Sequence, residues 1–234
     1  MPFVAKLRGG YGYASDEGRN NIRMINGFLN QYNLSMGVQA GIIGNIIAES
    51  RLNPWMWYGN IPNGAYGLFQ FVPGRHYINN CKNLLGYGPS LSTSYPTENA
   101  SPDDGWAQLL AMIDDVLHKW NDTCWRDYWD KTTYSQLWTL VEDILSTYGG
   151  QDFRLSFREF CNIQDPMDAT IAFMACYEGP NPPNWRLRVD NANGIWSQLS
   201  PDTPPEPPGT RVSYSKFIYK LRPLWWQSNP NIRR

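Results

Sequence analysis

The chain has 234 residues, enough for one good-sized core with an appendage, and we expect one main domain. Its formal net charge of -1 offers no broad basic surface, which argues against binding to nucleic acid. The N-terminal segment MPFVAKLRGGYGY lacks the apolar stretch of a signal peptide, and no later segment approaches the length of a membrane helix. We therefore expect a soluble protein, made in a cytoplasm, with no membrane contact.

Cysteine and histidine spacing gives no sign of a metal centre or of any cofactor. The four cysteines lie far apart without a CxxC pair, so buried thiols are expected instead of a zinc knuckle or a dense disulfide framework. Neither His76 with Cys81 nor His118 with Cys124 has the spacing of a standard metal site. The 11 tryptophans and 14 tyrosines are unusual for this length. Most should fill the core, although planar faces with a polar tip also suit a sugar-binding groove.

The first third of the chain predicts two helices and a hairpin. Residues 1–20, rich in glycine and polar groups, should form an irregular arm, and apolar residues at helical spacing predict a helix from about Arg19 to Tyr32. Ser35 is placed to cap a second helix, which contains the apolar stretch VQAGIIGNIIAES and ends before Asn53 and Pro54. Glycine, proline and aromatic residues then alternate, and they predict a small hairpin around GAYGLFQFV.

The rest of the chain predicts three more helices and an extended linker. Ser101 and Pro102 open an amphipathic run through Trp120, and a second helix is expected from about Tyr134 to Tyr148. Asp165 and Pro166 open a third helix, which Gly179 and Pro180 end, and residues 200–210 form a Pro-rich linker before a short tail, 211–234. The fold class is therefore α+β, predominantly α.

Glu49 is the only charge in VQAGIIGNIIAES. At 100° per residue it falls between Val38 and Ile42, so its carboxyl group points out of the apolar stripe and should be semi-buried. Burial and the negative end of the helix dipole both favour a protonated carboxyl group. A protonated glutamic acid is what a glycosidase uses to protonate a leaving oxygen. The alternative is an ordinary helix end at which Glu49 reaches solvent or pairs with Arg51.

Three blocks carry a resemblance to a known family: GIIGNIIAESRLNP, GAYGLFQF and DATIAFMACYEGPNPPNWRLRVDNA. Together they resemble the lysozyme-like superfamily, and within it the phage tail lysozymes, which are related to soluble lytic transglycosylases. The resemblance spans about Asn21 to Ala192 and implies a lysozyme-like catalytic domain at 21–199. It leaves out the tail and does not cover a segment of about 80–163 in detail, which we interpret as a helical insertion.

The resemblance also implies roles for individual residues. Glu49 matches the catalytic general acid, and Ser50 follows it in the motif. Gln70 matches a hairpin glutamine that lines the sugar groove, with Tyr66 and Phe71 as its expected stacking neighbours. Tyr177 matches a groove tyrosine of the last motif.

The second catalytic group is less clear. Many lysozymes place a second carboxylate on the hairpin, but no Asp or Glu occurs from Ser50 to Thr97, so a hairpin nucleophile is excluded. Three options remain: a carboxylate from elsewhere, with Glu178 or Glu17 as candidates; a water activated by polar groups; or the substrate's own N-acetyl group. Glu178 could equally form a helix-end ion pair with Arg186 or Arg188.

The leading functional hypothesis is an enzyme that cleaves the β-1,4 bond between N-acetylmuramic acid and N-acetylglucosamine in bacterial peptidoglycan. Lytic transglycosylase chemistry, an inactive tail or wall-binding component, and action on chitin are the alternatives. We expect the protein in the phage tail of the virion, or in the host cytoplasm before lysis. The C-terminal tail is a candidate contact with other phage tail proteins.

Overall fold

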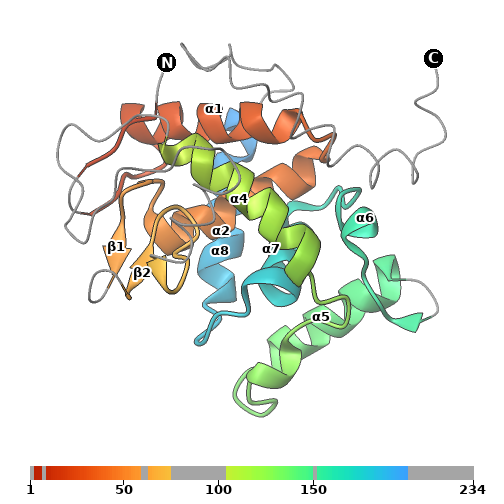
Figure 1. The fold of residues 1–234 in the computed structure, drawn as a ribbon. Helices are drawn as coiled ribbons and strands as arrows, with labels where there is room; N and C mark the ends of the chain where they lie inside the picture. Colours follow the sequence, from red (N-terminus) through yellow and green to blue (C-terminus); the bar gives the residue numbers. More distant parts are fainter. Residues whose placement is uncertain (1–2, 7–8, 59–62, 75–103, 150–151, 200–234) are drawn as a thin grey trace, which may run out of the picture. The chain divides into compact units, whose positions relative to one another are not determined.

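The computed structural model describes residues 3–6, 9–58, 63–74, 104–149 and 152–199. These residues are mostly helical, with one small antiparallel hairpin, which confirms the predicted fold class. The central helix is α2 (Met36–Ser50), which packs most extensively against α7 (Pro166–Phe173) and α8 (Trp185–Ile195) (Figure 1). No described helix is long and apolar enough to cross a membrane. The predicted linker and tail lie outside the described residues.

The first helix, α1 (Asp16–Asn30), begins three residues earlier than predicted, inside the expected arm. Its start is fixed by Ser15, whose side chain accepts a hydrogen bond from the amide of Gly18 at 3.1 Å, and by acidic residues in the first turn. The rest of the arm is held by two buried asparagines: Asn21 bonds the backbone of Val4, and Asn53 bonds that of Lys6. These hydrogen bonds attach the described part of the arm to the rest of the domain.

The second helix confirms its predicted cap and end. Ser35 accepts a hydrogen bond from the amide of Val38 at 3.1 Å, and the helix ends at Ser50 because Arg51 adopts a left-handed conformation with φ of 49°. Almost every side chain between is buried. Glu49 therefore lies in the last turn of a helix that neighbours enclose, at the point where the helix reaches the surface.

Close packing around α2 depends on its glycines. A Cβ atom added to Gly44 would lie 2.7 Å from the carbonyl oxygen of Arg188 and 2.8 Å from the Cβ of Ala192, both in α8. Gly41 faces the backbone of α7 in the same way, with 2.7 Å to Thr170. These contacts let the backbones of three helices approach each other, which a larger residue would prevent.

We expect Gly44→Ala to lower the free energy of unfolding by about 1–3 kcal/mol, because the added methyl group overpacks the contact between α2 and α8. Urea unfolding followed by circular dichroism measures this change. Gly12→Ala is the matched control, since no heavy atom lies within 4 Å of the Cβ position there. Equal stability of the two variants would show that the helices do not pack this closely.

The hairpin lies partly upstream of its predicted position. Strand β1 (Trp57–Tyr58) pairs with β2 (Ala65–Tyr66), with Trp57 opposite Tyr66. Only β2 falls inside GAYGLFQFV. The following residues turn back on themselves, because the amide and carbonyl of Phe71 both bond the backbone of Tyr66.

The insertion is helical where it is described. It contains α4 (Asp104–Lys119), the short 3₁₀ helix η1 (Arg126–Tyr128), α5 (Ser135–Tyr148) and α6 (Phe157–Phe160). The predicted cap at 101–103 lies outside the described residues. Asp165 caps α7 as predicted, and its side chain accepts from the amide of Asp168 at 2.9 Å.

Two features of the C-terminal part were not predicted. After α7 the chain continues as a π-helix, η3 (Met174–Glu178), and ends at Gly179 as expected. Residues after the GPNPP segment then form α8 and the 3₁₀ helix η4 (Trp196–Gln198). The three described cysteines, Cys124, Cys161 and Cys176, are buried free thiols as predicted, and Cys81 lies outside the described residues.

Candidate active site

Two carboxyl groups from different elements bind one guanidinium group from a third element. Arg188 of α8 donates from Nη2 to Oε1 of Glu49, and from Nη1 to Oε2 of Glu178 at 2.6 Å. The side chain of Arg188 is 4% exposed, that of Glu178 is 7% exposed, and that of Glu49 is 19% exposed. We call these three residues the carboxyl–guanidinium cluster. Glu49 is its most accessible member.

The guanidinium group of Arg188 is held in a fixed orientation. Its Nε donates to the carbonyl of Pro183 at 3.0 Å, and its Nη1 donates to Oδ1 of Asn45 at 2.8 Å. Asn45 is itself held because its amide nitrogen donates to the carbonyls of Gly41 and Thr170. Arg188 therefore presents fixed donors to both carboxyl groups, and little further ordering is needed for the cluster to form.

The π-helix brings Glu178 to this position. Its wider turn changes the direction in which side chains leave the helix axis, and such turns are common at functional sites. The turn closes when the amide of Gly179 donates to the carbonyl of Met174 at 2.8 Å, with Gly179 at φ of 54°. Glycine tolerates this conformation without strain.

The carboxyl group of Glu178 favours its protonated form. The pKa of Glu178 is raised to about 8, mainly because the group is buried; the charge of Glu49 adds to the rise, and the attraction of Arg188 partly offsets it. In addition, Oε1 of Glu178 is buried and has no hydrogen-bond partner among the described residues. One guanidinium charge facing two carboxyl groups is electrically balanced when the pair retains one proton. Glu178 is the member of the cluster that holds this proton.

Stability should fall as pH rises through the window that Glu178 defines. Between its ordinary value of 4.5 and about 8, the folded state holds a proton that the unfolded state has released. We expect Glu178→Gln to flatten this decline, because an amide does not titrate. Urea unfolding at intervals from pH 5 to pH 9 tests this. The exposed Asp190 gives the control, since Asp190→Asn should leave the wild-type decline in place.

Two predicted substrate-binding residues are buried in the structure. Ser50 is fully buried, and its hydroxyl donates to the carbonyl of Ile46 at 3.0 Å. The ring of Tyr66 is also fully buried, with its centroid 4.4 Å from that of Trp57. Ser50 thus supports the helix end and Tyr66 supports the hairpin. Their roles in substrate binding stay predictions.

The other hairpin residues are half-buried. The side-chain amide of Gln70 donates to the carbonyls of Met56 and Gly67, at 3.1 and 2.9 Å. These bonds fix the amide nitrogen of Gln70 within the turn. The ring of Phe71 packs against Phe69, with the centroids 5.6 Å apart. Their roles in substrate binding stay predictions.

Tyr177 lies next to Glu178 and points into the insertion. Its hydroxyl donates to Oδ2 of Asp115 in α4 at 2.9 Å, and burial raises its pKa well above the usual value of 10. The bond joins the π-helix to α4. Tyr177 thus connects the segment that carries Glu178 to the insertion through a hydrogen bond. Its role in the sugar groove, which the motif implies, stays a prediction.

A cavity of about 720 Å³ opens beside Glu178. We call it the loop cavity, because much of its wall comes from the loop that follows α4. Its lining consists of His118, Lys119, Trp120, Asn121, Trp125, Tyr128, Tyr177, Glu178 and Gly179. It is therefore rich in aromatic side chains and is lined in part by Glu178, but not by Glu49.

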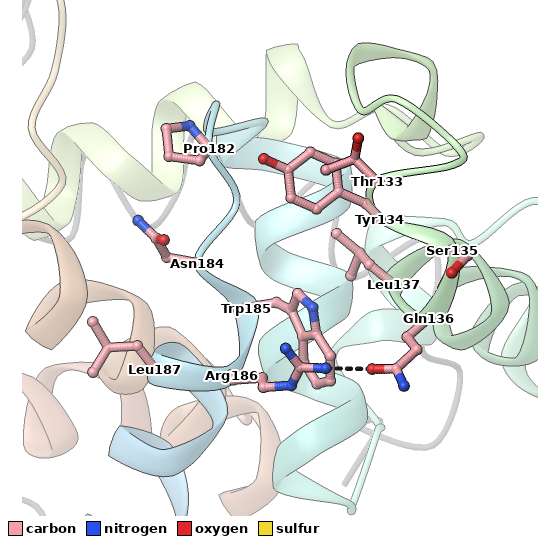
Figure 2. Close-up of a pocket in the computed structure, with 10 residues that line it drawn as sticks. All are labelled: Thr133, Tyr134, Ser135, Gln136, Leu137, Pro182, Asn184, Trp185, Arg186 and Leu187. Carbon is pink, nitrogen blue, oxygen red and sulfur yellow. Dashed lines mark hydrogen bonds between the residues drawn. The ribbon is translucent and has the colours of Figure 1, made fainter.

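A second cavity, of about 550 Å³, lies between the start of α5 and the residues that lead into α8 (Figure 2). Arg186 spans it: the guanidinium group stands 4.6 Å from the ring centroid of Trp185 and donates to the side chain of Gln136. Neither Glu49 nor Glu178 lines this cavity. Among the described residues, no group of three His, Cys, Asp or Glu side chains is arranged to hold a metal ion.

Comparison with protein families places the chain in a known family. A family described as phage tail lysozyme matches residues 20–199. The chain belongs to the phage tail lysozyme family. The match covers α2, the hairpin, the insertion and α8, and hence all three members of the cluster. A phage tail lysozyme is a lysozyme-like domain that acts on bacterial peptidoglycan, and its family associates it with the virion tail.

Reasoning from sequence missed the partner of Glu49. It matched Glu49 to the general acid and considered Arg188 only as a partner for Glu178. The structure shows that Arg188 serves both carboxyl groups, so the helix-end ion pair of Glu178 is present. Asn45 lies in the motif GIIGNIIAESRLNP, which assigns it no function, and the structure shows that it orients Arg188.

Proposed function

We propose that this protein is a muramidase that hydrolyses the β-1,4 bond between N-acetylmuramic acid and N-acetylglucosamine, with Glu49 as the general acid. The observation that carries the proposal is the position of Glu49: the last turn of the buried helix α2, partly exposed, and ion-paired to a fixed arginine. A general acid must reach solvent-borne substrate while its protonation is controlled by neighbours. Glu49 is the most accessible member of the cluster and has Arg188 and, through it, Glu178 as neighbours.

The cluster supplies the proton. Glu178 holds a proton at neutral pH because its pKa is raised to about 8. In the proposed mechanism this proton passes to Glu49 in the substrate complex, which leaves Glu178 ionised and paired with Arg188. Glu49 then protonates the glycosidic oxygen as the bond to the anomeric carbon breaks. The carboxylate that remains on Glu49 is stabilised by Arg188, which already donates to it.

Glu178 is poorly suited to attack the sugar. Its carboxyl group is almost fully buried, and it binds the same guanidinium group as Glu49. An inverting pair needs room for a water between its carboxyl groups, at about 6.5 to 9.5 Å. Here Arg188 bridges the two groups. We therefore assign the second role to the N-acetyl group of the substrate, and Glu178 positions Arg188.

Lytic transglycosylase chemistry is the second candidate, and the absence of any Asp or Glu from Ser50 to Thr97 favours it. After assistance by the N-acetyl group, attack by water gives a reducing sugar, whereas internal attack by the sugar's own hydroxyl gives an anhydro sugar. The two products differ in mass by one water.

The substrate class is tested by incubating the protein with purified peptidoglycan and, in parallel, with chitin oligomers. We expect soluble fragments from peptidoglycan and little cleavage of chitin. Preferential cleavage of chitin would overturn the substrate assignment. Sedimentation of the protein with cell walls, without release of fragments, would support a binding component instead of an enzyme.

We also propose where the enzyme acts and which proteins it contacts. The family's association with the virion tail supports delivery of the enzyme by the virion, and action in the host before lysis is the alternative. Contact with other phage tail proteins through residues 211–234 stays a prediction, because these residues lie outside the described part.

A further inference from the structure

The loop at 121–128 is fastened to the π-helix that carries Glu178. The amide of Asn121 donates to the carbonyl of Cys176 at 2.8 Å, and the amide of Trp125 donates to that of Ala175 at 2.6 Å. Both bonds link the insertion to the segment just before Glu178. The loop therefore holds a fixed position beside the cluster.

This loop presents two aromatic side chains to the loop cavity. The ring of Trp125 covers Gly179, where an added Cβ would lie 3.3 Å from the indole. Tyr128 stands edge-on to Trp125, with 5.3 Å between ring centroids, and is 61% exposed. Trp125 is half-buried and Tyr128 is exposed, and both line the loop cavity.

The chemistry of the loop cavity suits a neutral sugar. Its charges are mixed: Glu178 and Lys119 both line it, and Lys119 is paired with Asp115 at 2.8 Å. A pyranose ring has apolar faces that stack on aromatic side chains and hydroxyl edges that form hydrogen bonds with polar ones, and the lining offers both kinds. The volume of about 720 Å³ falls within the range of small-molecule sites.

We propose that the loop cavity is a subsite for one N-acetylhexosamine unit of the glycan strand, with the indole of Trp125 as its stacking face. The proposal rests on the proposed glycosidase function, but it assigns a new binding residue. Trp125 belongs to the insertion, which the quoted family motifs do not cover. The insertion then lengthens the substrate groove beyond the residues that carry the motif.

Binding of chitotriose tests the subsite, measured by titration calorimetry in a Glu49→Gln background so that the ligand stays intact. Adding Trp125→Ala should weaken binding roughly tenfold. Trp125→Phe, which keeps an aromatic face, should recover most of the affinity. Trp196→Ala is the matched control, because this tryptophan lies on η4, is 40% exposed and does not line the loop cavity. Thermal melting by circular dichroism confirms that each variant is folded.

The binding and cleavage measurements test the subsite and the muramidase proposal separately. Unchanged affinity in the folded Trp125→Ala variant would overturn the subsite, and cleavage of peptidoglycan by the wild type would leave the muramidase proposal intact. Conversely, loss of affinity with Trp125→Ala in a protein that cleaves no peptidoglycan would support the subsite and contradict the muramidase.

A different observation carries a second inference. The sulfur atoms of Cys124, in the same loop, and Cys176, in the π-helix, lie 2.6 Å apart and are buried. The two thiols are free in the structure, and the residues are 52 positions apart in the sequence. Structural disulfides form outside the reducing cytoplasm, which is where a virion protein meets the cell wall.

We infer that Cys124 and Cys176 form a disulfide in an oxidising solution and so tie the insertion to the segment that ends in Glu178. With oxidised glutathione as the oxidant, the two thiols lose two protons and two electrons, one S–S bond forms, and the glutathione disulfide is reduced to two thiols. Burial raises the pKa of the Cys176 thiol, so the reaction should be slow in the folded protein.

Thiol alkylation in denaturant, before and after incubation with oxidised glutathione, tests this inference by mass spectrometry. The chain has four cysteines, and we expect four alkylated thiols before oxidation and two after it. Peptide mapping should show the 124–176 link. Cys161→Ser, a buried cysteine elsewhere, should still form the link, whereas Cys124→Ser should not. Four alkylated thiols after oxidation, or a link between other cysteines, would overturn it.

Discussion

Glu49→Gln should reduce the rate of peptidoglycan cleavage by about 10²- to 10⁴-fold, the range of a lost general acid. Glutamine has nearly the same shape and keeps an oxygen that can accept from Nη2 of Arg188, so the fold should be retained. It has no acidic proton to give to the glycosidic oxygen. The rate of release of soluble fragments from purified cell walls measures the effect.

Two controls make the result specific. Asp190→Asn removes an exposed carboxylate from α8, the helix that carries Arg188, and should leave the rate unchanged. Sedimentation with cell walls should show that Glu49→Gln still binds. A folded Glu49→Gln variant with the wild-type rate would remove Glu49 from the mechanism.

Replacing Arg188 with methionine should lower the free energy of unfolding by about 3–5 kcal/mol, the cost of breaking a buried ion pair from one side. Glu178 would lose its charged partner while remaining buried, and Asn45 and Pro183 would lose a hydrogen bond each. Urea unfolding at neutral pH measures this loss.

The double variant Arg188→Met with Glu178→Gln tests the cause. An amide is less costly to bury than a carboxyl group without a partner, so the second substitution should restore part of the stability. A loss that is the same in the single and double variants would show that Arg188 acts through packing alone. A loss below about 1 kcal/mol for Arg188→Met would contradict the buried cluster, because only exposed ion pairs are so weak.

The elements that could be predicted are those with local causes. Ser35 and Asp165 each cap a helix through a side chain three residues from its partner amide, and these signals are visible in the sequence. The position of Glu49 in the last turn of α2 follows from the apolar run and the helix end after it. The family resemblance, based on three motifs, added the expectation of a catalytic acid.

The features that could not be predicted depend on contacts between distant residues. Glu49 and Arg188 are 139 positions apart, and no local pattern states that one guanidinium serves two carboxyl groups. The π-helix is a one-residue change in helix winding that residue periodicity does not reveal. Tyr66 resembles a groove residue by its motif, yet the packing of Trp57 on its ring buries it.

The most direct test of the account is the identity of the new chain ends in a digest of purified peptidoglycan, read by mass spectrometry. We expect disaccharide fragments with N-acetylmuramic acid at the reducing end from the wild type, and none from Glu49→Gln. N-acetylglucosamine at the new reducing ends, or equal release by Glu49→Gln, would contradict it. Anhydro ends would retain Glu49 as the acid and change the reaction to that of a lytic transglycosylase.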